Sequence, residues 1–197
     1  MRRSALLAFA LLLPGPAALA APAQLPATVQ ALRCESCHGS DGNSSDPSVP
    51  RLNGQIAGYI ERRLKEFLDL PSQDPHAFDM GQRASKIHSD SFAAIGAYYA
   101  SAAPSPARPD PRRARAGEAL YLRGAPGQRI AACISCHGPN GEGSRTAPRL
   151  AGQHGLYLRH QLERMRLYLR VSEPMFHNSQ NMTDDQIRDL VAYLGGD

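Results

Sequence analysis

Apolar residues recur at helical spacing in two separate parts of the chain. They fall at Ile60, Leu64, Phe67 and Leu68 in the first half, and at Leu158, Leu162, Met165 and Leu169 in the second. Residues three and four positions apart share one face of an α-helix, so both runs predict amphipathic helices. A later helix in each half is predicted by Phe92, Ile95 and Tyr99 and by Ile187, Leu190 and Leu194. The sequence therefore predicts an all-α fold.

Local signals mark where some of these helices begin and where loops intervene. Thr183, followed three residues later by Gln186, is typical of a capping box and predicts the start of the final helix. Residues 39–50 and 138–148 are rich in Gly, Pro, Asn and Ser, which favours loops.

The second half of the chain repeats the first. Pro50-Arg51-Leu52-Asn53-Gly54-Gln55 matches Pro148-Arg149-Leu150-Ala151-Gly152-Gln153, and Tyr59 falls on Tyr157 at the same offset. A repeat of this length indicates one structural unit that occurs twice. Four prolines within residues 104–111 predict a semi-rigid extended connector. We therefore expect a first domain over 21–100, a Pro-rich linker over 101–111 and a second domain over 112–197.

Residues 1–20 have the pattern of an export signal. Arg2 and Arg3 precede an apolar stretch over 5–13, and small residues around Ala20 and Ala23 offer two cleavage points. The apolar stretch is too short to span a bilayer, and no later segment approaches that length. The chain is therefore expected to be exported to the bacterial periplasm, where any membrane contact would be peripheral.

Charge does not indicate a nucleic-acid partner. The 22 Lys and Arg exceed the 18 Asp and Glu by four, and removal of Arg2 and Arg3 with the signal would leave an excess of two. No basic run interleaved with aromatic residues accompanies this balance. Nucleic-acid binding is therefore not expected.

One pentapeptide motif occurs twice and contains every cysteine of the chain. Its copies are Cys34-Glu35-Ser36-Cys37-His38 and Cys133-Ile134-Ser135-Cys136-His137. The C-x-x-C-H string is typical of c-type haem attachment. Each cysteine can form a thioether with a haem vinyl group, and the histidine can ligate the iron. The motif predicts two haem c groups, bound through Cys34, Cys37, Cys133 and Cys136.

Three other interpretations of the cysteines remain. Paired cysteines can belong to a zinc site, but here the pairs are about a hundred residues apart and each is followed by its own histidine. A thioredoxin-like redox motif requires a βαβ context, which the sequence does not predict. Two disulfides are the third alternative for an exported protein.

The second axial ligand of each iron is predicted from the methionines. Met80 is the only methionine in the first half after the signal segment, whereas the second half contains Met165, Met175 and Met182. Met165 lies on the apolar face of a predicted helix, and Met182 aligns with Ile87, an apolar packing position. Met175 alone aligns with Met80.

The predicted iron ligands are therefore His38 with Met80 and His137 with Met175. His76 and His177 lie close enough in sequence to these methionines to be rival ligands. The remaining histidines are interpreted as surface or turn residues: His88, His154 and His160.

These motifs resemble class I cytochromes c, and more narrowly the dihaem cytochromes of the c-four type, over essentially the whole chain after the signal. The resemblance implies two tandem class I cytochrome c domains in a monomer, each wrapped around one haem. It also implies that the carbonyls of Pro50 and Pro148 accept hydrogen bonds from His38 and His137. The chain departs from the family before its first haem motif, where only a short helix fits.

Histidine and methionine together saturate the iron and favour a raised reduction potential. A saturated iron leaves no place for substrate, so the sequence predicts an electron carrier and not an enzyme. The expected partners are a quinol-oxidising complex as donor and a terminal oxidase or reductase as acceptor. Two alternatives remain: an electron-accepting subunit of a flavoprotein dehydrogenase of the sulfide-oxidising type, and a dihaem peroxidase with one open iron.

Overall fold

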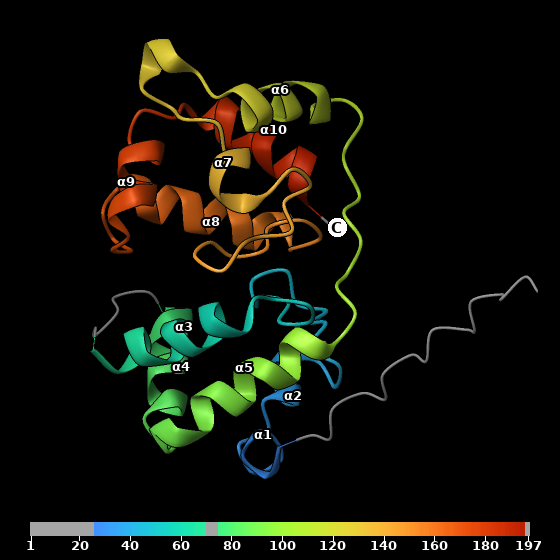
Figure 1. Ribbon diagram of the computed structural model, residues 1–197, viewed down its shortest axis with the longest axis vertical. Coiled ribbons are helices and arrows are strands. Elements are labelled where there is room, and N and C mark those ends of the chain that lie inside the picture. Colours follow the sequence, from blue (N-terminus) through green and yellow to red (C-terminus); the bar gives the residue numbers. More distant parts are fainter. Residues whose placement is uncertain (1–25, 70–74, 196–197) are drawn as a thin grey trace, which may run out of the picture.

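The protein is described by a computed structural model that covers residues 26–69 and 75–195. Two helical bodies are stacked along the long axis of the molecule, and an extended segment joins them along one side (Figure 1). The described residues form helices and loops, with two isolated β-bridges and no strand. The all-α prediction is confirmed. The expected signal segment, with cleavage after Ala20 or Ala23, lies outside the described residues.

The first body is built around the helix that carries the first apolar run. Its helices are α1 (Ala27–Ala31), α2 (Glu35–His38), α3 (Ala57–Asp69), α4 (Pro75–Ala84), the short 3-10 helix η1 (Ser89–Ser91) and α5 (Phe92–Ser101). Helix α3 packs against α4 and α5. Its buried Ile60 and Leu64 meet Phe92, Ile95 and Tyr99 of α5 in one hydrophobic cluster, as the helical spacing predicted.

The second body contains a corresponding set of helices, and these pack around its last helix. Its helices are α6 (Ala114–Arg123), the 3-10 helix η2 (Pro126–Gln128), α7 (Ile134–His137), α8 (Gly155–Arg166), α9 (Glu173–Ser179) and α10 (Asp184–Leu194). Helix α10 packs against both α6 and α8, and α9 packs against α8. The buried residues that form its core are Leu120, Tyr121, Ile130, Leu158, Met182, Ile187, Leu190 and Leu194.

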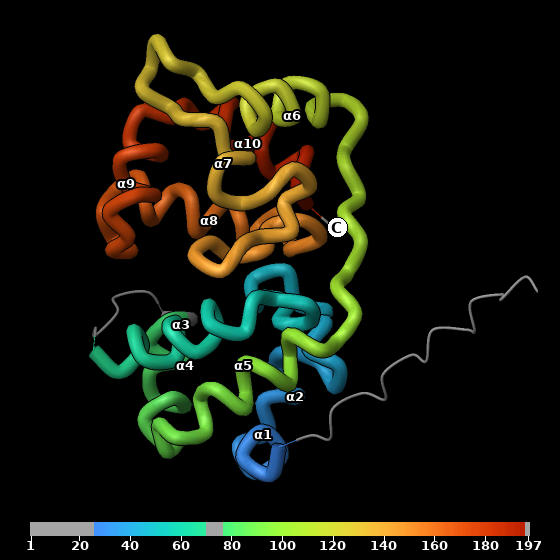
Figure 2. The backbone as a smooth tube through the Cα atoms, viewed as in Figure 1, coloured from blue at the N-terminus to red at the C-terminus, as the bar shows by residue number. Residues whose placement is uncertain are grey.

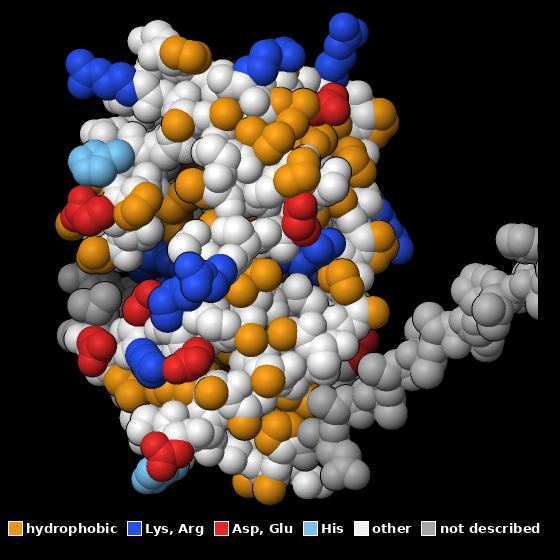
Figure 3. All heavy atoms as spheres, viewed as in Figure 1, with side chains coloured by type: hydrophobic (Ala, Val, Ile, Leu, Met, Phe, Trp, Pro, Cys, Tyr) orange, Lys and Arg blue, Asp and Glu red, His pale blue; other side chains and the backbone are white. Residues whose placement is uncertain are grey.

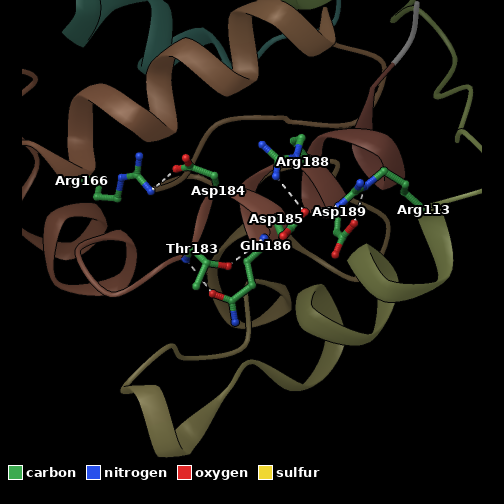
Figure 4. A network of polar contacts seen from close by, with 8 residues as sticks. All are labelled: Arg113, Arg166, Thr183, Asp184, Asp185, Gln186, Arg188 and Asp189. Atoms are coloured by element: carbon green, nitrogen blue, oxygen red, sulfur yellow. Dashed lines mark hydrogen bonds and ion pairs between the residues drawn. The ribbon is translucent and has the colours of Figure 1, made fainter.

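The start of α10 is fixed by the predicted capping box, which is confirmed (Figure 4). The Gln186 backbone N–H donates to Thr183 Oγ1 at 3.2 Å, and the Thr183 N–H donates to Gln186 Oε1 at 2.9 Å. Two of the otherwise unpaired donors at the helix start are thereby satisfied. On neighbouring turns Arg166 pairs with Asp184 and Arg113 with Asp189, each at 2.7 Å.

The two bodies differ most in their first helices. Helix α6 has ten residues and crosses α10 at Gly117, where a Cβ atom would lie 1.9 Å from the Asp189 carbonyl oxygen. Only glycine allows the two backbones to approach this closely. Helix α1 has five residues, so the expectation of a short first helix before the first haem motif is confirmed.

The connector between the bodies is attached to both of them, and its course is clear in Figure 2. The Asn53 side chain donates to the Ala103 carbonyl at 2.7 Å on the first body. On the second body the N–H groups of Arg108 and Asp110 donate to the carbonyls of Gly195 and Ala192, at 2.7 and 2.8 Å. These bonds hold the connector at both of its ends.

Candidate haem sites

Each C-x-x-C-H motif forms a single helical turn, α2 or α7. The first cysteine caps each turn, and the turn ends at a glycine with positive φ, 82° for Gly39 and 81° for Gly138. A side chain in this conformation would be strained, so glycine lets the chain turn sharply away after the histidine. The turn presents both cysteines and the histidine of each motif to one cavity.

The two histidine rings are held by the same hydrogen bond. Nδ1 of His38 lies 2.9 Å from the Pro50 carbonyl oxygen, and Nδ1 of His137 lies 2.9 Å from that of Pro148. A carbonyl can only accept, so Nδ1 carries the proton and Nε2 keeps its lone pair. This confirms the expected role of both prolines, and it is the orientation that a metal-bound histidine needs.

Burial favours the form of the histidines that can bind iron. Both side chains are 5 % exposed. Burial lowers the pKa of His38 and of His137 below the ordinary value, although the hydrogen bonds to Pro50 and Pro148 act in the opposite direction. The neutral imidazole is the ligand form.

No disulfide joins any two of the four cysteines, as the two-disulfide alternative would require. Cys34 and Cys133 are half-buried, whereas Cys37 and Cys136 are exposed. Burial raises the pKa of the Cys34 thiol and raises that of Cys133 to about 11. Within 26–69 and 75–195 no three His, Cys, Asp or Glu side chains cluster as a zinc site would require.

One cavity of about 1290 Å³ receives both motifs. Pockets for a single small molecule measure roughly 300 to 1,000 Å³, so this volume suits two large groups. The predicted site residues that line it are Cys34, Cys37, His38, Met80, Cys133, Cys136, His137 and Met175. Apolar side chains such as Ile60, Leu64 and Leu158 complete the walls. The apolar lining of this cavity and the four cysteine thiols together fit two haem rings.

The cavity lining is also strongly basic. It contains nine arginines and two acidic residues, Glu66 and Asp79. On the face shown in Figure 3, basic side chains gather where the two bodies meet, and others lie at the outer end of the second body. Nε of Arg149 is buried without a hydrogen-bond partner among the described residues, and burial lowers the pKa of Arg149. These donors fit the carboxylates of haem propionates.

All four methionines after the signal segment reach the cavity. Met80 on α4 and Met175 on α9 are half-buried, whereas Met165 and Met182 are 8 and 4 % exposed. Met182 belongs to the core of the second body, as predicted. Position along the wall does not distinguish these methionines, so the choice of Met175 still depends on its alignment with Met80.

The other histidines are mostly exposed, but one of these predictions is wrong. His154 is 3 % exposed, and its Nε2 lies 2.8 Å from the Ser44 carbonyl oxygen of the first body. It is buried because the residue before α8 lies at the junction of the bodies. His177, a rival ligand, is exposed with Nε2 3.4 Å from Glu173. The side chain of the other rival, His76, lies outside the described residues.

The junction of the two bodies is the part of the site that sequence reasoning missed. Gln55 and Gln153 each reach across and bond the backbone of the opposite body, at Arg149 and Arg51. Their occurrence in both copies of the repeated hexapeptide was visible in the sequence, where it indicated only duplication. Arg170, which donates to the Tyr59 hydroxyl across the same junction, has no counterpart in the repeat and gave no signal.

Comparison with known proteins agrees with this geometry. The sequence model of the cytochrome c family matches residues 124–196. Cytochrome c4 of Thiocapsa roseopersicina is 34% identical over 169 residues, which cover 83% of this chain and 86% of that protein. A protein of Stutzerimonas stutzeri strain A1501 described as a thiosulfate dehydrogenase electron acceptor is 33% identical over 173 residues, covering 83% and 78%.

Structural similarity leads to the same family. The cytochrome c4 structure of Acidithiobacillus ferrooxidans aligns with a TM-score of 0.77 at 33% identity, over 83% of this chain and 98% of that one. No helix in the described part of the chain is long and apolar enough to cross a bilayer. The chain therefore belongs to the cytochrome c4 family, electron-transfer proteins of two class I cytochrome c domains with two haem c groups.

Proposed function

We propose that Cys34 and Cys37 bind one haem covalently and that Cys133 and Cys136 bind the other. In this proposal His38 and Met80 are the axial ligands of the first iron, and His137 and Met175 are those of the second. The observation that carries it is the matched pair of imidazoles, each with Nδ1 fixed by a proline carbonyl and Nε2 free in one cavity.

This ligand set suits electron transfer without substrate turnover. A thioether sulfur is a soft ligand that favours ferrous iron, so a His–Met pair raises the reduction potential. With six ligands in place the iron has no open position and rearranges little between its two oxidation states. We assign no catalytic residue.

The chain would work in the periplasm as a monomeric shuttle for single electrons. Its domains would extend over 21–100 and 112–197, after removal of a signal over 1–20. A quinol-oxidising complex would be the donor, and a terminal oxidase or reductase the acceptor. Such carriers dock weakly and briefly through small interfaces.

The deciding experiment is a redox titration of the holoprotein followed by optical and magnetic spectra. Two low-spin haems, each with the spectrum of His–Met ligation, are expected at raised potentials. A persistent high-spin haem, or turnover of hydrogen peroxide, would contradict the proposal and favour a dihaem peroxidase.

A second candidate is an electron-accepting subunit of a dehydrogenase. The relatives described as thiosulfate dehydrogenase electron acceptors favour it. The flavoprotein of the sulfide-oxidising type belongs to the same class of partner. Purification of the native protein decides between the two: a carrier elutes alone, whereas a subunit co-purifies with a larger dehydrogenase chain in fixed ratio.

A further inference from the structure

A single peptide group links the first haem histidine to the second domain. The carbonyl of the Pro50–Arg51 peptide accepts from His38 Nδ1, with the two atoms 2.9 Å apart. The N–H of the same peptide donates to Gln153 Oε1 at 2.8 Å. Gln153 belongs to the other domain, so one rigid amide plane connects this glutamine to the imidazole of the first domain.

The second haem histidine is linked to the first domain in the same way. The Pro148–Arg149 peptide accepts from His137 Nδ1 at 2.9 Å and donates to Gln55 Oε1 at 2.8 Å. Each domain thus supplies the glutamine that bonds the histidine-orienting peptide of its neighbour.

Both glutamines are fixed in the orientation that this contact requires. Gln55 and Gln153 are 6 and 7 % exposed. Oε1 of each also accepts from the next N–H in its own chain, that of Ile56 at 2.9 Å or His154 at 3.0 Å. The Nε2 groups donate to the carbonyls of the same opposite residues, Arg149 at 3.0 Å and Arg51 at 2.9 Å.

Hydrogen bonds in such a chain polarise one another. An acceptor on the N–H side of an amide increases the partial charge on its carbonyl oxygen, which strengthens the bond on that side. A stronger bond from Nδ1–H makes the imidazole a better electron donor at Nε2. Increased donation stabilises ferric iron more than ferrous iron and therefore lowers the reduction potential.

We propose that Gln153 is a positioning residue for the haem of the first domain and Gln55 for the haem of the second, each tuning the potential of the neighbouring domain's haem through one peptide group. The inference rests on the proposed iron ligation by His38 and His137. It gives the domain junction a redox role in addition to a mechanical one.

The test compares Gln153→Met and Gln55→Met in the holoprotein. Methionine is close in shape to glutamine but cannot replace its amide oxygen as the acceptor for the peptide N–H. Gln153→Met is expected to raise the potential of the first haem, and Gln55→Met that of the second. The difference between the two midpoint potentials should therefore change in one direction for Gln153→Met and in the opposite direction for Gln55→Met. In ferric protein, the paramagnetically shifted haem-methyl resonances should move mainly for the haem in the domain opposite the substitution.

Gln153→Glu is the matched rescue, because it keeps an acceptor at Oε1 and should return the first haem's resonances toward their wild-type positions. If the two glutamines only held the domains together, either methionine variant would loosen the contact between the domains and move both haem potentials in the same direction. That result would overturn the inference. Wild-type spectra without histidine ligation of the irons would overturn the proposed ligands and this inference with them. His–Met spectra without the crossed shifts would overturn the inference alone.

Discussion

Arg170 of the second domain donates from Nη2 to the hydroxyl oxygen of Tyr59 in the first domain, with the two atoms 2.9 Å apart. Its Nη1 donates to Gln161 Oε1 at 2.7 Å, which fixes the guanidinium plane. Burial alone would raise the pKa of Tyr59, but the positive charges of Arg170 and Arg63 lower it below the ordinary value. The pair is therefore a charge-assisted contact between the domains.

Replacement of Tyr59 by phenylalanine is expected to destabilise the holoprotein. Loss of the hydroxyl leaves a part-buried guanidinium N–H without its acceptor, which costs about 1.5–3 kcal/mol for a hydrogen bond to a charged group. Denaturant unfolding measures this loss. Tyr98→Phe is the control, because no hydrogen bond to its hydroxyl is found in the described part of the chain; its expected change is below about 0.5 kcal/mol. Equal losses for the two variants would contradict a stabilising role for the contact.

Met175→Ala is expected to convert only the second haem to a high-spin or water-ligated form with a lower potential, because the proposed soft sulfur ligand is removed. Absorption and electron paramagnetic resonance spectra, with a redox titration, measure the change. An unchanged low-spin spectrum would identify Met182 or His177 as the ligand instead.

Met182→Ala is the contrasting variant. Its side chain is buried in the core of the second domain, so truncation should leave both haems low-spin. The loss of packing should lower the free energy of unfolding by about 2–5 kcal/mol.

The two haems are expected to have unequal potentials. Helix α6 supplies the buried Leu120 and Tyr121 to the core beside the second haem motif, whereas α1 supplies only Val29 beside the first. A less shielded haem is more exposed to water, which stabilises the charged ferric form. The first haem should therefore titrate at the lower potential. Coincident titration curves for the two haems would contradict this.

Gly117→Ala is expected to destabilise the second domain. The added Cβ would meet the Asp189 carbonyl oxygen at 1.9 Å, so α6 and α10 must separate. Overpacking of this kind costs about 1–3 kcal/mol. Gly127→Ala is the matched control in the same domain, since a Cβ added there would have no neighbouring atom within 4 Å. Thermal unfolding should show a lower midpoint for Gly117→Ala alone, and equal midpoints would argue against close helix contact.

Thr183→Ala is expected to destabilise α10 by about 0.5–2 kcal/mol, because the first turn loses its cap. Arg188→Gln removes only an exposed ion pair with Asp185 on the same helix and should cost less than about 1 kcal/mol. Denaturant unfolding of both variants ranks the two interactions. A larger loss for Arg188→Gln would show that surface charge, and not the capping box, fixes this helix.

Much of each domain was predictable because the relevant interactions are local. Helical spacing, the Thr183–Gln186 box and the two haem motifs are signals within a few residues of the elements they form. The proline carbonyls followed from family resemblance, and the structure has both in place.

The junction was not predictable from such signals. His154 is the residue immediately before α8, and nothing in its local sequence indicates burial; only the stacking of the second domain on the first buries it. Arg170 likewise follows α8 in an exposed-looking segment, yet its partner Tyr59 lies 111 positions earlier in the chain. Contacts between two domains leave no periodicity in the sequence of either one.

The exchange between Gln55 and Gln153 has the form of an isologous contact, in which residue i of one unit meets residue j of the other and the reverse. A symmetric homodimer of a single-haem ancestor would have the same form. Once the connector joins the units, their association no longer depends on protein concentration, because each is the other's neighbour at a high effective concentration. Duplication would thus free the two copies to diverge. They differ in this way at Arg170, which has no match in the first copy, and at α1, which is shorter than α6.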